Sequence, residues 1–168
     1  EGSYKHAHGV SEDLKYALRE SIELLGNEAA RQLRLKAAQD KTGIFTGKNR
    51  LRAAELSDEC LRWMYRLLFL FFVESRPELN YAPVNDEDYL AGYSLESLRD
   101  LELVPLTTES ERNGSYLHKS ITRLFKFFES GTPVDTNVLP FADATANAFT
   151  IEKLPSTLFD PAKMPLLK

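Results

Sequence analysis

Hydrophobic positions in the first part of the chain recur at helical spacing. Between residues 11 and 25 the apolar positions Leu14, Leu18, Ile22 and Leu25 lie three or four residues apart, as expected for an amphipathic helix. Ser11 is suited to cap the N-terminus of this helix, and Gly26 is suited to end it. The same kind of spacing predicts a second helix over residues 28–40.

The longest apolar run covers residues 67–73, between Arg66 and Glu74. It lies inside a longer helical pattern and predicts a helix over residues 50–75, which ends before Pro77. The run is too short to cross a bilayer, which takes about 20 mostly apolar residues. Because seven apolar side chains in a row point in every direction around a helix, we expect a central helix that its neighbours cover on most sides.

Later in the chain, Ser94 is placed to cap a shorter helix over residues 95–103, and an amphipathic helix is predicted over residues 115–131 with Gly131 as its C-cap. Residues 77–92 and 107–114 are rich in turn-forming and polar residues and predict loops. The last 37 residues contain Pro133, Pro140, Pro155, Pro161 and Pro165. These prolines exclude long helices there, and short turns, a small hairpin and extended segments are all compatible with them.

The predicted fold class is therefore mainly α. We expect a disordered or extended segment at residues 1–10, a helical bundle at residues 11–131 and a Pro-rich irregular segment at residues 132–168. The chain of 168 residues has 43% hydrophobic and 27% charged residues, which is ordinary for a globular protein. The single cysteine, Cys60, excludes an internal disulfide and a cysteine-based metal cluster, and we expect its side chain to be buried. The N-terminal residues do not resemble a signal peptide, so a cytoplasmic protein without a membrane segment or metal site is expected.

Charge is distributed unevenly along the chain. Residues 31–52 hold seven basic residues and one acidic residue, whereas residues 74–112 hold ten acidic and three basic residues. The basic stretch has two interpretations: a solvated surface, or a contact with the phosphate backbone of DNA. The candidates for DNA contact are Arg31, Arg34, Lys41, Lys48, Arg50 and Arg52.

Four stretches together resemble large bacterial adenine-specific DNA methyltransferases, namely the type IIG restriction–modification methylases and the related BREX-type phage-defence methyltransferases. The stretches are LRWMYRLLFLFFVESRPEL (61–79), GYSLESLRDLE (92–102), LHKSITRLFKFFESG (117–131) and LPSTLFDPAKMPLLK (154–168). The residues that carry the likeness in the first stretch are Tyr65, Arg66, Leu67, Leu68, Phe69, Glu74 and Arg76, and in the last stretch Leu158, Phe159 and Asp160. The likeness extends from about Val10 to the C-terminus and lies in helix cores rather than in catalytic motifs.

The chain lacks the catalytic motifs of that family. It has no Gly-rich loop for S-adenosylmethionine and no Asn-Pro-Pro-Tyr type motif for a flipped adenine. The resemblance therefore implies a helical connector fragment without catalytic residues or a cofactor of its own, in which residues 132–168 lead toward a missing methyltransferase domain. It implies that the parent protein uses S-adenosylmethionine, and that the fragment's partners are this adjoining domain and, through the parent, DNA.

Two other functional classes stay open. The spacing of Arg112 and His118 is similar to that of the HEPN ribonucleases, in which an arginine and a histidine act on RNA. Alternatively the chain is a protein-interaction bundle that meets its partner through the acidic residues 74–112. Glu74 and Arg76 themselves either mark a functional site or form a buried or half-buried ion pair that fixes helix packing, and the ion pair is the favoured interpretation.

Overall fold

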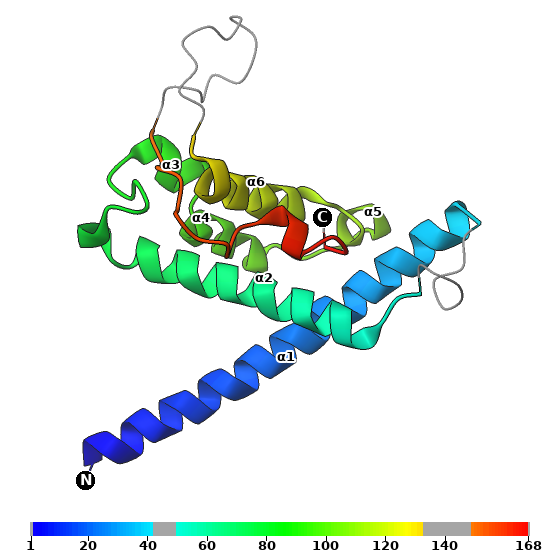
Figure 1. Cartoon of the computed structure of the whole chain (residues 1–168), viewed down its shortest axis with the longest axis horizontal. Helices are drawn as coiled ribbons and strands as arrows, with labels where there is room; N and C mark the ends of the chain where they lie inside the picture. The colour runs from blue at the N-terminus through cyan, green and yellow to red at the C-terminus, as the bar shows by residue number, and fades with distance from the viewer. Residues whose placement is uncertain (1, 42–49, 133–148, 168) are drawn as a thin grey trace, which may run out of the picture. The chain divides into compact units, whose positions relative to one another are not determined.

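The computed structural model describes residues 2–41, 50–132 and 149–167, with side chains from residue 9 onward, and within these ranges the chain is mainly helical with no strand. The α-helices are α1 (Gly2–Gln39), α2 (Ala53–Glu74), α3 (Glu87–Gly92), α4 (Leu95–Arg99), α5 (Glu109–Arg112) and α6 (Tyr116–Ser130). Three 3₁₀ turns, η1 (Pro77–Leu79), η2 (Asp100–Leu103) and η3 (Pro161–Lys163), complete the described elements (Figure 1). The predicted mainly-α class is confirmed.

The chain divides into two compact units rather than one bundle over residues 11–131. Unit 1 is formed by Glu1–Tyr65 and Ala162–Lys168, and unit 2 by Arg66–Pro161. The boundary falls inside α2. The last residues of the chain therefore belong to the same unit as the first ones.

The first helix is longer than its sequence pattern predicts. Residues 2–10, expected to be disordered or extended, are the start of α1, and the helix continues through Gly26 instead of ending there. A glycine costs only about 1 kcal/mol inside a helix, and the position corresponding to a Cβ on Gly26 lies 3.7 Å from the sulfur of Cys60 on α2. We attribute the continuity to this packing, which outweighs the local preference of glycine.

Unit 1 is built around the first half of α2. Its buried side chains include Ala37, Leu56, Cys60, Trp63, Met164 and Leu167. The carboxylate of Glu59, also buried, accepts hydrogen bonds from the backbone N–H groups of Leu166 (2.8 Å) and Leu167 (3.1 Å). Glu59 thus ties the C-terminal residues to α2, and the burial predicted for Cys60 is confirmed.

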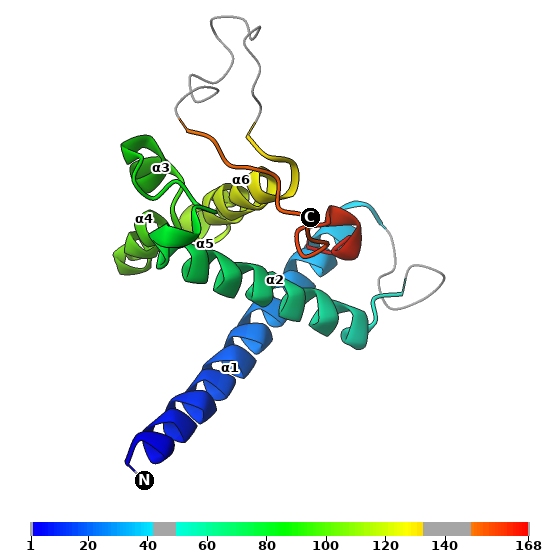
Figure 2. The same ribbon diagram turned by 60° about the vertical axis from the view of Figure 1, so that its left-hand side comes forward.

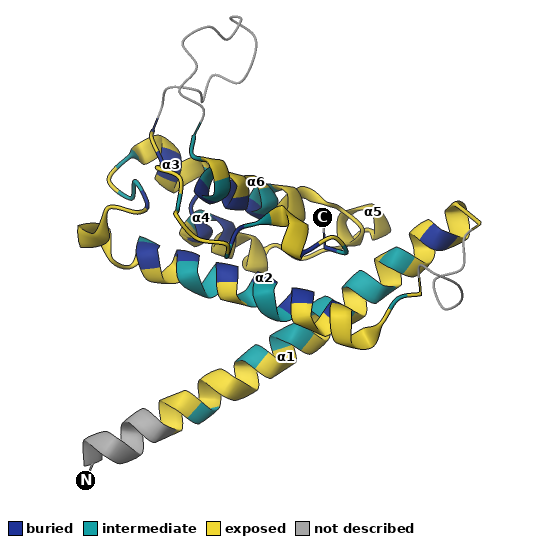
Figure 3. Cartoon of the chain, viewed as in Figure 1, coloured by how far each residue is buried: buried dark blue, intermediate teal, exposed yellow. Residues whose placement is uncertain are grey.

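Unit 2 is built from the second half of α2, α6 and the segment after residue 148. One side of α6 buries Ile121, Leu124, Phe125 and Phe128 (Figure 3). The ring of Phe159 packs against Phe125 and Phe128, each at a centroid distance of 5.6 Å, and against Phe69 on α2 at 5.8 Å. The irregular C-terminal segment therefore supplies the centre of an aromatic cluster.

The apolar run of α2 is covered less completely than predicted. Leu70 and Val73 are fully buried, but Phe71 and Phe72 are 45% and 51% exposed. The prediction of a helix covered on most sides is thus wrong for these two residues. No helix in the described part of the chain combines the length and hydropathy needed to span a membrane.

Two of the predicted loops contain short helices. Within residues 77–92 lie η1 and α3, and Asp86 caps α3 by accepting from the backbone N–H of Tyr89. Within residues 107–114 lies α5, where Thr108 and Glu111 form a capping box. Ser94 caps α4 as predicted, although the helix expected up to residue 103 continues after Arg99 as the 3₁₀ turn η2.

The predicted C-cap of α6 is confirmed, and it directs the returning chain. Gly131 has a φ of +80°, a conformation that side chains other than glycine rarely adopt. Thr132 and Ile151 exchange two hydrogen bonds of 3.0 Å, and the N–H of Leu154 donates to the carbonyl of Phe128. Residues 149–160 therefore run past the end of α6 without forming a helix (Figures 1 and 2).

Candidate functional site

The described basic residues that are predicted to contact DNA belong to unit 1. Arg31 and Arg34 are exposed on the second half of α1, one turn apart. Nε and Nη2 of Arg31 each donate a hydrogen bond of 2.8 Å to the carboxylate of Glu28. These bonds, together with one from Gln32, hold the pKa of Glu28 below its usual value.

The other candidates lie at the end of α1 and before α2. Lys41, Arg50 and Arg52 are exposed, and Arg52 lies 3.2 Å from the carboxylate of Glu55. Lys48 lies outside the described residues. Every described candidate is thus accessible from solvent, which is the condition for a contact with phosphate.

Arg66 joins two stretches that are far apart in the sequence. Its side chain is buried, and it donates from Nε to the carbonyl of Leu158 (2.8 Å) and from Nη2 to the carbonyl of Asp160 (2.9 Å). The guanidinium also lies over the rings of Phe125 (5.2 Å) and Phe159 (5.6 Å). Arg66 therefore fixes the Leu-Phe-Asp element inside unit 2.

Glu74 does not form the predicted ion pair with Arg76. Its carboxylate accepts from the hydroxyl of Tyr89 (2.7 Å) and from the backbone N–H of Leu95 (3.0 Å) at the start of α4. Arg76 instead lies 3.4 Å from Glu78 and over the ring of Phe72. The N–H of Leu95 is available to Glu74 because the first N–H groups of a helix have no partner within the helix.

The same arrangement shifts two pKa values. Burial raises the pKa of Glu74, and the hydrogen bonds from Tyr89, Leu95 and Glu96 oppose this shift without cancelling it. Burial and the neighbouring carboxylate of Glu74 raise the pKa of Tyr89. The Tyr89 hydroxyl therefore stays protonated at physiological pH and acts as a hydrogen-bond donor.

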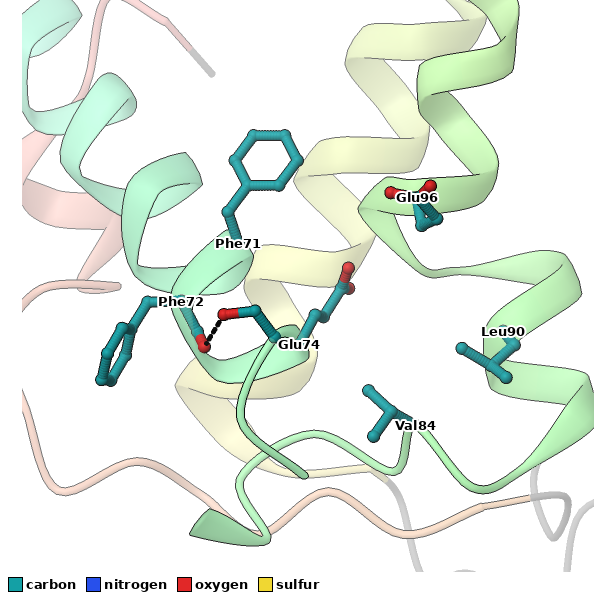
Figure 4. A pocket seen from close by; sticks show the side chains of 7 residues that line it. Phe71, Phe72, Glu74, Val84, Leu90 and Glu96 are labelled. Atoms are coloured by element: carbon teal, nitrogen blue, oxygen red, sulfur yellow. Dashed lines mark hydrogen bonds between the residues drawn. The ribbon is translucent and has the colours of Figure 1, made fainter. Parts of the chain in front are cut away.

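A pocket of about 600 Å³ opens beside Glu74 in unit 2. It is lined by Phe71, Phe72, Glu74, Ser75, Val84, Leu90 and Glu96. Figure 4 shows Glu74 pointing toward the side of the pocket where Glu96 lies, with Phe72 on the opposite side of Glu74 from Leu90. The pocket thus combines apolar walls with two carboxylates.

The possible ribonuclease pair is divided between two helices. Arg112 is the last residue of α5, where its Nε donates to the carbonyl of Leu106, and His118 lies in the first turn of α6. The backbone is not helical at Gly114 and Ser115. Arg112 and His118 are therefore not held on one continuous helix.

Across the described ranges, no group of three or more His, Cys, Asp or Glu side chains is arranged to hold a metal ion. Comparisons with family models, with curated proteins and with solved structures found no match to this chain. The functional argument therefore rests on the residues themselves.

Two features of the structure were not predicted from the sequence. One is the pocket, because Phe71, Leu90 and Glu96 come together only when α2, α3 and α4 pack. The other is the bond between Glu59 and the backbone at residues 166–167. The sequence signal available for the pocket was the excess of acidic residues within residues 74–112. The sequence contained no signal for the hydrogen bonds of Glu59.

Proposed function

We propose that the chain is a helical connector of an adenine-specific DNA methyltransferase or restriction–modification enzyme of the type IIG or BREX kind. The observation that carries this proposal is the contact of Arg66 with the Leu158–Asp160 backbone. It joins two separate stretches on which the resemblance rests. Those residues serve packing, which supports the role of a connector.

Unit 1 would contact the phosphate backbone of DNA. Its exposed Arg34, Lys41 and Arg50 support this role, because backbone contact requires accessible cations and no base-reading geometry. S-adenosylmethionine and the flipped adenine would bind to the adjoining methyltransferase domain of a cytoplasmic parent protein. The connector would orient that domain on the duplex.

The test is binding of the full chain to duplex DNA across a series of salt concentrations. We compare wild type with the triple variant Arg34→Gln/Lys41→Gln/Arg50→Gln. Each phosphate contact contributes about 0.9 to the slope of log K against log salt. We expect the variant to bind more weakly and its slope to fall by roughly 2–3.

The matched control is Lys119→Gln/Lys126→Gln/Lys153→Gln, which removes the same charge from exposed positions of unit 2. It should bind like wild type. Equal losses in both variants would indicate a general charge effect, and no binding by wild type at low salt would refute DNA contact by unit 1.

A further inference from the structure

We propose that the pocket of unit 2 beside Glu74 is a docking site for a partner protein, and that it takes an arginine flanked by an apolar residue from an exposed segment of that partner. This inference concerns unit 2 and is independent of the proposed DNA contact by unit 1. It rests on the walls of the pocket, its charge and the way this chain already holds arginines.

The walls suit the aliphatic stem and planar head of an arginine. Phe71 and Phe72 follow each other on α2 and are both about half exposed, although phenylalanine normally avoids water. Val84 and Leu90 add apolar surface from the loop before α3 and from α3 itself. A volume of about 600 Å³ lies in the range of pockets that hold small ligands.

The charge of the pocket selects a cation. Glu74 reaches it from the end of α2, and Glu96 reaches it from the first turn of α4. Around them, residues 74–99 contain six acidic and two basic residues. Arg76 pairs with Glu78 (3.4 Å) and Arg99 pairs with Glu96 (2.9 Å) in exposed ion pairs, so an incoming arginine would share Glu96 with Arg99 or displace it.

This combination disfavours other occupants. Phosphate groups of nucleic acids and anionic membrane surfaces would be repelled by the excess of carboxylates. A hydrated metal ion would gain nothing from phenylalanine and leucine walls, since hard cations prefer a shell of oxygen ligands. A purely apolar side chain would use the walls of the pocket but not the excess of negative charge around it.

The chain repeatedly holds its own arginines against aromatic rings. Arg66 lies 5.2 Å from the Phe125 centroid, Arg123 lies 5.4 Å from the Tyr93 centroid, and Arg76 lies 5.8 Å from the Phe72 centroid. Arginine is favoured over lysine in such places because its planar head stacks on rings and pairs with a carboxylate through two N–H groups. The exposed face of Phe71 offers the ring contact. The exposed carboxylate of Glu96 offers the ionic contact, in competition with its pair to Arg99.

The test is an NMR titration of the full ¹⁵N-labelled chain with three acetylated tripeptide amides: Leu-Arg-Leu, Leu-Gln-Leu and Leu-Glu-Leu. We expect the arginine peptide to shift the backbone amides of Val84, Leu90 and Glu96, and to bind more tightly than the other two. Glu96→Gln should weaken its binding about two- to fivefold, as for a solvent-exposed ion pair, and Phe71→Ala should weaken it at least as much. Both positions are exposed, so these variants are expected to fold.

Glu102→Gln is the control, because it removes an exposed acid that does not line the pocket. It should leave the affinity unchanged. Equal binding of the three peptides would overturn the preference for a cation. Shifts that spread over the acidic surface and persist in Phe71→Ala would indicate unspecific attraction, and the absence of shifts at about 10 mM peptide would refute the site.

Discussion

At the scale of single residues, Arg66 shows how one side chain can determine the course of a distant segment. Its fork-shaped head donates to two carbonyls, those of Leu158 and Asp160. A buried carbonyl that loses its donor costs about 1–3 kcal/mol. The buried charge of Arg66 is therefore compensated by backbone dipoles and aromatic rings.

Arg66→Met should lower the free energy of unfolding by about 2–4 kcal/mol, because two acceptors lose their donors and two ring contacts are lost. Urea denaturation measures this change. The unfolding free energy of Arg66→Lys should lie between those of wild type and Arg66→Met, since lysine keeps the charge but cannot donate to both carbonyls as the guanidinium does. The control is Arg76→Met at an exposed position, expected to change stability by less than about 0.5 kcal/mol; equal effects at both positions would contradict the role of Arg66.

Glu74 makes stability depend on pH in an unusual direction for a carboxylate. Its pKa is raised above the usual 4.5 in the folded protein, mainly by burial. The folded state therefore binds the proton more tightly than the unfolded state does. The stabilisation that comes from this group is complete below pH 4.5 and is lost as the pH rises through the raised pKa of Glu74.

Glu74→Gln should remove this pH dependence. The difference in unfolding free energy between wild type and Glu74→Gln should shift in favour of the variant as the pH rises from about 4 to 7. Urea denaturation at several pH values measures it, with the exposed Glu102→Gln as the control for the loss of one negative charge. A difference that does not vary with pH would show that burial of Glu74 does not affect its titration.

At the scale of elements, the end of α6 depends on one glycine. Gly131 combines a φ of +80° with a close approach of the returning chain, so that a Cβ would lie 3.2 Å from the carbonyl oxygen of Ile151 and 3.4 Å from the nitrogen of Lys153. The backbone conformation alone costs about 1–3 kcal/mol for other residues. Both the positive φ and the close approach of Ile151 and Lys153 therefore disfavour any side chain at position 131.

Gly131→Ala should therefore destabilise the protein by at least about 1 kcal/mol. It should also speed hydrogen exchange at the amides of Thr132 and Leu154, which bond across this turn. Gly92→Ala is the matched control, because a Cβ there meets nothing within 4 Å and its φ is not positive. A loss of stability in Gly92→Ala as large as that in Gly131→Ala would contradict this interpretation.

The elements that could be predicted are those with strong local signals. α2 and α6 have long apolar patterns and lie within two or three residues of their predicted bounds. The continuity of α1 through Gly26 could not be predicted, because packing against Cys60 is a non-local effect. The small helix α5 could have been found from the pair Thr108 and Glu111, whose spacing is that of a capping box.

The candidate site was predictable to a similar extent. The exposure of Arg34, Lys41 and Arg50 follows from their charge alone. The partners of Glu74 do not, since the nearest opposite charge in the sequence, Arg76, lies against Glu78, whereas Glu74 accepts from the backbone at the start of α4. Reasoning from neighbours in the sequence favours Arg76 as the partner of Glu74, whereas the fold places Tyr89 and Leu95 next to it.

At the scale of the whole molecule, the returning C-terminal chain serves both units. Residues 149–161 place Phe149, Ile151 and Phe159 in the core of unit 2. Ala162–Lys168 belongs to unit 1, where Met164 and Leu167 are buried. Each unit is therefore completed by residues from the last part of the chain.

Deletion of Ala162–Lys168 should weaken unit 1 selectively. Glu59 would lose two hydrogen-bond donors and the core would lose two apolar side chains. Hydrogen exchange should become faster in α2 over residues 53–65, whereas the amides of α6 should keep their protection. Lys163→Ala, at an exposed position, is the control; unchanged exchange in the first half of α2 after the deletion would refute the dependence.

The hydrogen bonds of Glu59 also have a consequence for the order of events during protein synthesis. Residues 1–65 leave the ribosome first, but residues 162–168, which complete the same unit, are added 97 residues later. At about 5–20 residues per second this delay lasts roughly 5–20 s. For that time the carboxylate of Glu59 lacks the backbone donors of Leu166 and Leu167, and unit 1 lacks the buried side chains of Met164 and Leu167.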